Sequence, residues 1–242
     1  MIKIMKSLIA GFVLLTTSIA SQAENEISYS GNIGFMSDYM YRGIHQSSSS
    51  AMGGLDVEYG NFYLGTWFAD LQEDGWVSGS HRGFEYDVYA GFGFDLTDSI
   101  SASIGYTIYR YTDKGASAFD DDYDEVNLGL GFAASENLSF AIDYAIGENT
   151  ATDQSETDYD VLTISADYMG IYLLVGQWGV SEDDASKSEV DASWWEIGYS
   201  RSVGDFDLSA GFVLSEQELA QASDTGEDGD FSRFVFSMST SF

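Results

Sequence analysis

The chain lacks cysteine and proline, and it has only nine basic residues against 40 acidic ones. The lack of cysteine is compatible with an oxidising compartment and with the cytosol, so it does not identify the location. The lack of proline suits a protein in which nearly every backbone N–H takes part in sheet hydrogen bonding. A formal net charge of −31 excludes a nucleic-acid partner bound through phosphate neutralisation, and it favours attraction of cations.

Long apolar runs are also missing. The longest, residues 8–20, follows two lysines and precedes the small residues of segment 21–23. A membrane-spanning helix needs about 20 apolar residues. The pattern therefore predicts a secretory signal peptide over residues 1–23, rather than the alternative of a membrane anchor, and a mature domain over 24–242. Removal of the two lysines takes the formal net charge from −31 to −33, and no transmembrane helix is expected in the mature part.

Alternation of apolar and small or polar residues pervades the mature part, and it is clearest at the end of the chain. There Phe234, Phe236 and Met238 alternate with valine and serines. Such alternation indicates strands with one apolar face. About twelve strands are expected, most of them roughly ten residues long, as membrane strands are. They begin near Ser28, Ala51, Phe62, Gly83, Ile100, Tyr123, Leu138, Tyr159, Ile171, Ser193, Phe206 and Ser232. The faces of those at Phe62 and Ile171 are not evident.

Short and long connections also alternate. The short ones lie near residues 60–61, 97–99, 135–137, 169–170 and 204–205, and the long ones at 45–50, 72–82, 113–122, 148–158, 182–192 and 217–230. This layout predicts an all-β fold, a closed antiparallel up-and-down transmembrane β-barrel with short periplasmic turns and long acidic outer loops. A soluble β-sandwich is the alternative. The hairpin order, the loop asymmetry and aromatic residues near strand ends, suited to interfacial girdles, favour the barrel. Those aromatics are Phe62, Phe84, Phe94, Phe132, Tyr168, Trp195, Tyr199, Phe206 and Phe242.

Three segments carry a resemblance to a known family. They are GFMSDYMYRGIHQS at residues 34–47, EYDVYAG at 85–91 and GYSRSVGDFDLSAGF at 198–212. Together they resemble the TorF-type porin family of proteobacterial outer-membrane proteins. The resemblance spans most of the mature chain, and its specific part is the SDYMYRGIHQS run. It implies a barrel in the outer membrane of a Gram-negative cell and a pore. The terminal Phe242 resembles the carboxy-terminal signal that such barrels present to the barrel assembly machinery.

The face opposite the apolar residues predicts the lining of a pore. Charged side chains are costly against lipid, so those at strand positions are expected to face a wet interior. The pore-lining candidates are Asp38, Arg42, Glu85, Asp87, Asp143, Asp167, Glu196 and Arg233. The excess of acids predicts a porin-like channel for passive diffusion of small polar solutes, with a preference for cations.

Topology indicates where a constriction could form. Closure would bring the first strand beside the last, so Asp38, Arg42, Glu85, Asp87 and Arg233 are expected at a similar outer height. We therefore expect an outer constriction with crossed charges. The alternative is that Asp38 and Arg42 brace the first loop.

Glycines are frequent among the inward positions of the predicted strands. Gly91, Gly105, Gly198 and Gly211 are examples. Without side chains they leave space, which favours a narrow pore, although relief of strain in a curved sheet is an equal alternative.

Two other classes of function remain open. A hydrolase would need His45 or His81 with Ser47 and a loop acid, but no motif fixes that geometry, so no enzyme activity is expected. A sealed barrel could bind cations, lipopolysaccharide or a partner through its loops. The acids at residues 120–125 lack the spacing of a calcium loop, and Arg110 could meet lipid phosphate. We expect no cofactor and no metal, and outer-membrane lipid and lipopolysaccharide as surroundings.

Overall fold

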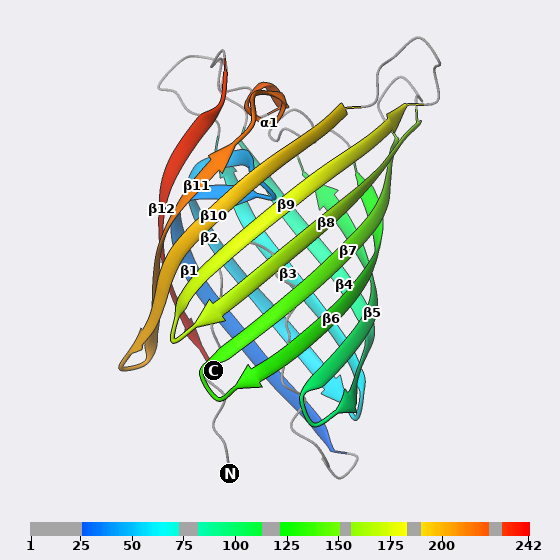
Figure 1. The fold of residues 1–242 in the computed structure, drawn as a ribbon, viewed down its shortest axis with the longest axis vertical. Coiled ribbons are helices and arrows are strands. Elements are labelled where there is room, and N and C mark those ends of the chain that lie inside the picture. The colour runs from blue at the N-terminus through cyan, green and yellow to red at the C-terminus, as the bar shows by residue number, and fades with distance from the viewer. Residues whose placement is uncertain (1–25, 73–81, 113–121, 151–155, 183–189, 223–228) are drawn as a thin grey trace.

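The structure is a computed structural model that describes residues 26–72, 82–112, 122–150, 156–182, 190–222 and 229–242. The predicted signal peptide, His81 and residues 120–121 lie outside these ranges. Twelve antiparallel strands close into one barrel in sequence order (Figure 1). They are β1 (Ile27–Tyr41), β2 (Ile44–Tyr59), β3 (Phe62–Gln72), β4 (Arg82–Thr97), β5 (Ile100–Tyr111), β6 (Tyr123–Ser135), β7 (Leu138–Thr150), β8 (Glu156–Tyr168), β9 (Ile171–Glu182), β10 (Val190–Val203), β11 (Phe206–Ser215) and β12 (Phe231–Ser241). The predicted fold class is confirmed.

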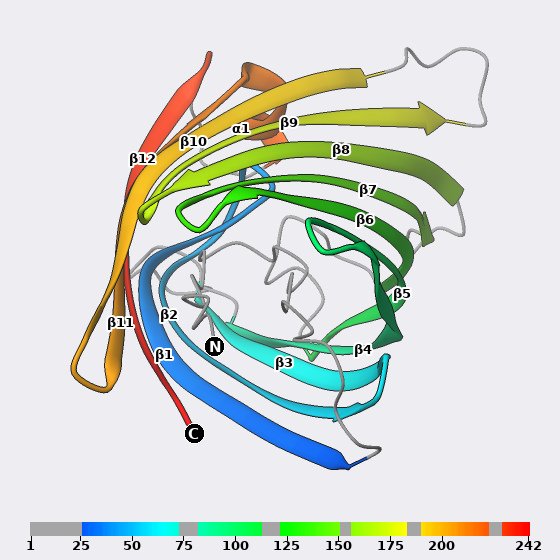
Figure 2. The ribbon, with the colours of Figure 1, turned by 60° about the horizontal axis from the view of Figure 1, so that its bottom comes forward.

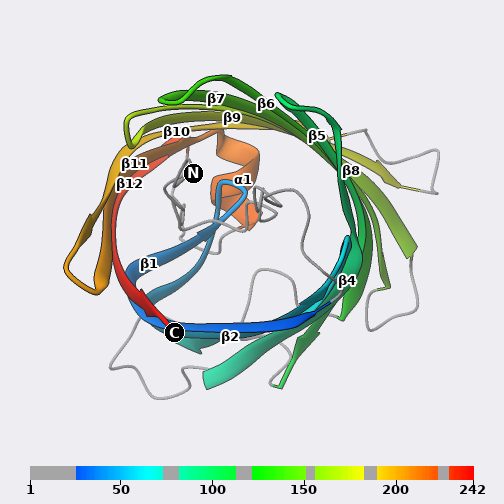
Figure 3. The same ribbon diagram turned by 90° about the horizontal axis from the view of Figure 1, so that it is seen from below.

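Closure depends on pairing between the two ends of the barrel sequence. β1 pairs with β12 from Asn32 opposite Ser241 to Met36 opposite Ser237. Gly31 and Phe242 extend this seam by exchanging two backbone hydrogen bonds of 3.0 and 2.9 Å. The strands therefore form a continuous ring, which is visible from below in Figure 3 and obliquely in Figure 2. A closed ring leaves no sheet edge, as a lipid environment requires.

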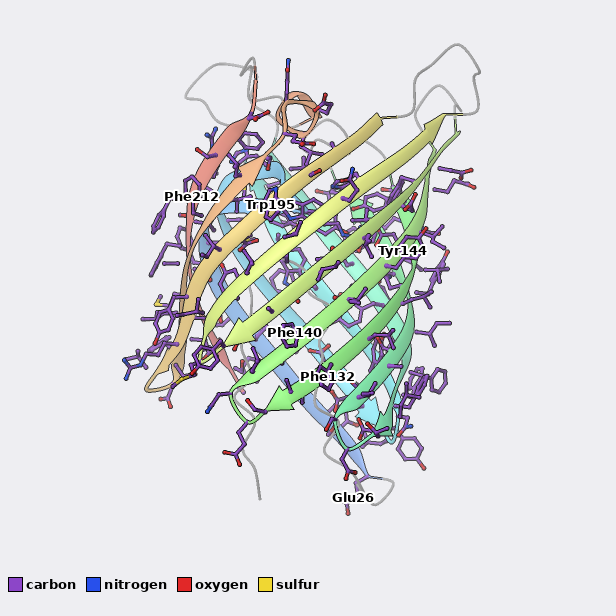
Figure 4. All side chains as sticks on the ribbon, in the orientation of Figure 1. Glu26, Phe132, Phe140, Tyr144, Trp195 and Phe212 are labelled. Atoms are coloured by element: carbon purple, nitrogen blue, oxygen red, sulfur yellow. The ribbon has the colours of Figure 1, made fainter. Side chains whose placement is uncertain are left out.

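The apolar face of each strand points outward. Figure 4 shows Phe132, Phe140 and Trp195 on the outside of the wall, and all nine aromatics predicted for the girdles are exposed. β3 and β9, whose faces the sequence left open, follow the same rule. Leu64 and Leu173 are exposed, whereas Leu71 and Trp178 are buried. The outer surface is therefore largely apolar, and the buried polar residues face the lumen together with buried tyrosines such as Tyr109, Tyr123 and Tyr159.

The turns differ at the two ends of the barrel. Met169-Gly170 closes the β8–β9 hairpin with positive φ at both residues, 56° and 87°, as the tight hairpin turns of type I′ require. The other predicted short turns lie at this same end, where the carboxy terminus also lies (Figure 1). The short helix α1 (Gln217–Ala222) follows β11 at the opposite end. Within the described ranges, no helix is long and apolar enough to cross a membrane.

Inward glycines lie beneath aromatic side chains of neighbouring strands. A Cβ added to Gly105 would lie 2.5 Å from the Tyr63 hydroxyl oxygen, and one added to Gly198 or Gly211 would lie 2.4 Å from the Tyr172 ring or hydroxyl. These glycines leave room for the tyrosines. The free space that the sequence analysis expected above them is therefore filled.

The first connection differs from the prediction. Residues 45–50 were expected to form a long loop, but they belong to β2, which begins seven residues earlier than predicted. The turn is Arg42-Gly43, with φ of 48° and 82°, again the pair of positive φ values of a type I′ turn. Ser47, Ser48 and Ser50 of this segment pair with β1 as strand residues.

Candidate functional site

The outer part of the β1–β2 hairpin leaves the barrel wall and enters the lumen. We call residues 37–51 the inner hairpin. The pairing of β1 with β12 ends at Met36, and the pairing of β2 with β3 begins at Met52. Between these points the two strands pair with each other, and Met40, Tyr41 and Ile44 are all buried. Figure 3 shows this hairpin inside the ring of strands, beside α1.

The tip of the inner hairpin is fixed by an ion pair with the opposite wall. Arg42 donates two hydrogen bonds to Glu125 of β6, from Nη1 to Oε1 at 2.6 Å and from Nη2 to Oε2 at 3.0 Å. The exposed fraction of the side chain is 12% for Arg42 and 0% for Glu125. A bidentate, largely desolvated pair of this kind is directional and strong. We call it the Arg42–Glu125 latch.

Aromatic side chains complete the surroundings of the latch. The Glu125 carboxylate also accepts hydrogen bonds from the hydroxyls of Tyr109 at 3.0 Å and Tyr159 at 2.9 Å. The Arg42 guanidinium lies 4.8 Å from the ring centroid of Tyr41 and 5.8 Å from that of Trp178. These distances fall within the range of cation–π attraction. The charge of Arg42 is thus neutralised within the lumen.

The backbone of the tip is held as well. Trp178 of β9 donates from Nε1 to the Arg42 carbonyl at 2.8 Å, and Ser215 of β11 donates to the Gly43 carbonyl at 2.6 Å. A Cβ on Gly43 would lie 2.6 Å from Trp194 Cβ and 2.9 Å from a Leu219 methyl carbon of α1. The hairpin tip therefore contacts β6, β9, β10 and β11, which are strands that do not pair with β1 or β2.

Two further acids lie beneath the inner hairpin. Glu85 and Asp87 point inward from β4, with 1% and 0% of their surface exposed. The hydroxyl of Tyr39, from the hairpin, donates to Glu85 Oε1 at 3.2 Å. Oε2 of Glu85 and both side-chain oxygens of Asp87 have no hydrogen-bond partner among the described atoms. Buried carboxylate oxygens without donors are unusual and require an explanation.

The other predicted pore-lining acids are spread along the lumen. Glu196 accepts a hydrogen bond of 2.7 Å from Tyr172, and Asp143 lies beside Gly129 of the neighbouring strand. Asp167 lies near the end of β8 that leads into the short Met169-Gly170 turn, where Oδ1 accepts from the Gly170 amide at 3.3 Å. These three face the interior at different heights.

The five residues expected at one constriction do not form a single charge cluster. Arg42 pairs with Glu125, which the sequence analysis did not include. Asp38 lies within the inner hairpin, 3.6 Å from His45 Nε2. Arg233 lies 5.4 Å from the ring of Phe231, its neighbour on the same strand. These contacts of Asp38 and Arg42 are of the kind that the brace alternative expects, and a role of the five in ion selectivity stays a prediction.

Glu125 was missed because it was counted with the acidic loop that precedes it. Alternation gave the signal needed to find it. Tyr123, Glu125 and Asn127 all occupy the inward parity of β6, and the structure buries all three.

The geometry around His45 differs from that of a catalytic triad. Its Nε2 is the atom nearest to both Ser48 Oγ, at 3.4 Å, and Asp38 Oδ1, at 3.6 Å. A triad places the serine and the acid on different ring nitrogens. Ser47, the serine proposed from sequence, is buried.

The acids at the start of β6 contact an arginine. Arg110 lies 3.7 Å from Asp122 and 2.9 Å from Asp124. Arg110 therefore pairs with carboxylates of its own protein, where the sequence suggested lipid phosphate. Among the described residues, no group of three or more His, Asp or Glu side chains could hold a metal ion.

Comparison with models of known protein families assigns the chain to one family. A family model described as a bacterial protein of unknown function, Gcw_chp, matches residues 20–242. The chain belongs to this family. No curated protein matches the chain. The resemblance to the TorF-type porins stays a prediction.

Solved structures share the fold of this Gcw_chp protein. The KdgM porin has a TM-score of 0.52 at 11% identity, over 88% of this chain and 99% of the porin. The NanC porin has a TM-score of 0.54 at 11% identity, with the same two coverages. An outer-membrane channel from Pseudomonas putida F1 has a TM-score of 0.55 at 12% identity, over 90% of this chain and 96% of the channel. At such identities the likeness establishes the barrel fold.

Proposed function

We propose that this protein is an outer-membrane channel for passive diffusion of small polar solutes, that it prefers cations, and that a signal peptide over residues 1–23 exports it. Its outward face is apolar and its inward face polar, as a barrel in a bilayer requires. Twelve strands lie between the eight of a filled barrel and the sixteen of an open porin. A narrow passage follows from that size.

The observation that carries the cation preference is the imbalance of charge in the lumen. Arg42 is neutralised by Glu125. Glu85, Asp87, Asp143 and Glu196 also face the interior. Fixed carboxylates in a confined, water-poor passage attract cations and repel anions. A structure of the KdgM porin contains oligogalacturonate, an acidic oligosaccharide. An acidic lumen disfavours such a ligand here, so the shared fold does not transfer it.

Uptake into liposomes containing the purified protein tests this function. Labelled lysine, glutamine and glutamate have similar sizes and different charges. We expect lysine to enter roughly tenfold faster than glutamate, because fixed charge changes the local ion concentration by such factors. Asp87→Asn should slow lysine and leave glutamine unchanged. Asp98→Asn, in an exposed turn, is the matched control and should change neither rate.

Equal rates for lysine and glutamate would contradict the cation preference. The channel itself would be contradicted if none of the three solutes entered, either through the native protein or through Arg42→Ala, in which the inner hairpin should be released.

A further inference from the structure

The two buried acids of β4 have aromatic residues on the neighbouring strands. Cross-strand pairing places Asp87 opposite Trp67 of β3 and opposite Tyr109 of β5. Glu85 is opposite Tyr111 of β5. Directly opposed side chains on one face of a sheet have Cβ atoms about 5 Å apart. Both carboxylates are therefore flanked by aromatic side chains.

The inner hairpin supplies the cover of this group. Tyr39 donates to Glu85 Oε1, and its ring meets Trp67 edge-on with centroids 5.5 Å apart. Asp87 is completely buried beneath this cover, with both carboxylate oxygens unpartnered in the described part of the chain. Acidic oxygens surrounded by aromatic rings and hydroxyls are the chemistry that recognises organic cations.

The latch shows which ligand such surroundings accept. At Glu125, a carboxylate with tyrosine and tryptophan neighbours holds the guanidinium of Arg42 through two hydrogen bonds and two ring contacts. Glu85 and Asp87 have the same kinds of neighbours, Tyr109 being near both groups. The second group thus repeats the composition of the first, but Oε2 of Glu85 and both carboxylate oxygens of Asp87 have no described donor.

We propose that Glu85 and Asp87 form a binding site for small organic cations with a guanidinium or ammonium group, and that the inner hairpin covers this site. Entry of the ligand displaces Tyr39, so binding and the covered state of the hairpin compete. The proposal rests on the proposed function, because a ligand reaches this depth through the lumen. It names the class of solute that the channel would select.

Titration calorimetry on the full-length protein in detergent micelles tests the site. The probe is methylguanidinium chloride, and its neutral analogue methylurea is the control ligand. We expect saturable binding of methylguanidinium and none of methylurea. Asp87→Asn and Glu85→Gln should each weaken binding by roughly tenfold or more, the effect of losing one charge-assisted hydrogen bond. The matched control Asp98→Asn should bind as the native protein does.

Several outcomes would overturn the site. One is an equal heat of binding for methylguanidinium and methylurea. Another is binding of methylguanidinium that both β4 variants retain. A third is an affinity for potassium, measured by competition with potassium chloride, as high as that for methylguanidinium. Loss of binding in a variant counts only if its heat-modifiable migration on gels shows a folded barrel. Liposome uptake of lysine, measured in parallel, separates the two proposals. Uptake without binding contradicts the site alone, and binding without uptake contradicts the channel alone.

Discussion

At the scale of single residues, the inner wall depends on pairs of tyrosine and glycine on neighbouring strands. Tyr63 of β3 lies over Gly91 and Gly105, and its buried hydroxyl has no hydrogen-bond partner in the described structure. Tyr172 of β9 lies similarly over Gly198 and Gly211. A glycine weakens a strand unless a neighbouring side chain covers it. The tyrosines supply that cover, and a Cβ would displace them.

This packing predicts a rescue between two substitutions. Gly105→Ala should lower the free energy of unfolding by about 1–2 kcal/mol, a typical cost of overpacking. The added methyl would lie 2.5 Å from the Tyr63 hydroxyl oxygen and no nearer than 3.4 Å to other atoms. Tyr63→Phe removes that hydroxyl and should restore most of the loss. Urea unfolding in detergent, followed by tryptophan fluorescence, measures each variant.

Tyr63→Phe alone is the control for this cycle. It should leave stability nearly unchanged, because the hydroxyl that it removes has no described hydrogen bond to lose. A double variant as unstable as Gly105→Ala alone would show that the hydroxyl is not the source of the strain.

At the scale of elements, the inner hairpin is the feature that sequence could not predict. Its alternation and its Arg42-Gly43 turn are local signals, and both indicate a hairpin. Its entry into the lumen depends on the points where pairing with β12 and β3 ends, at Met36 and Met52. Those points are set by contacts with distant strands, such as the latch to Glu125. The strands themselves, by contrast, were predictable because alternation and turn chemistry are local.

The hairpin predicts a change in conductance. Arg42→Ala should remove the latch and raise single-channel conductance or open probability in planar bilayers. A loss of about 2 kcal/mol, less than the usual cost of breaking a fully buried pair, increases the population of the released hairpin roughly 30-fold. Glu125→Gln should act in the same direction, and the double variant should add little to either change.

Arg110→Ala is the matched control for the latch. It also removes an arginine with carboxylate partners, Asp122 and Asp124, but its partners lie at the outer end of β6 and not at the hairpin tip. Its conductance should equal that of the native protein. An unchanged conductance in both Arg42→Ala and Glu125→Gln would mean that the hairpin does not control the passage.

At the scale of the whole molecule, two opposed faces of one rolled sheet account for the architecture. Closure, strand number and the direction of the apolar face follow from patterns that repeat along the chain, and the structure confirms them. The charge of the lumen was less predictable. Its acids could be assigned to the lumen from their alternate positions along the strands. Arg42 and Tyr39, however, pair with residues that are far from them in sequence. The proposed preference for cations therefore depends on how these interior charges act together.

The reversal potential of the purified protein in a planar bilayer under a tenfold potassium chloride gradient measures that combined effect. We predict a potential whose sign shows preferential passage of potassium, and a shift toward zero in Asp87→Asn. A reversal potential near zero in the native protein, or one of the sign that chloride preference produces, would contradict a cation-preferring channel.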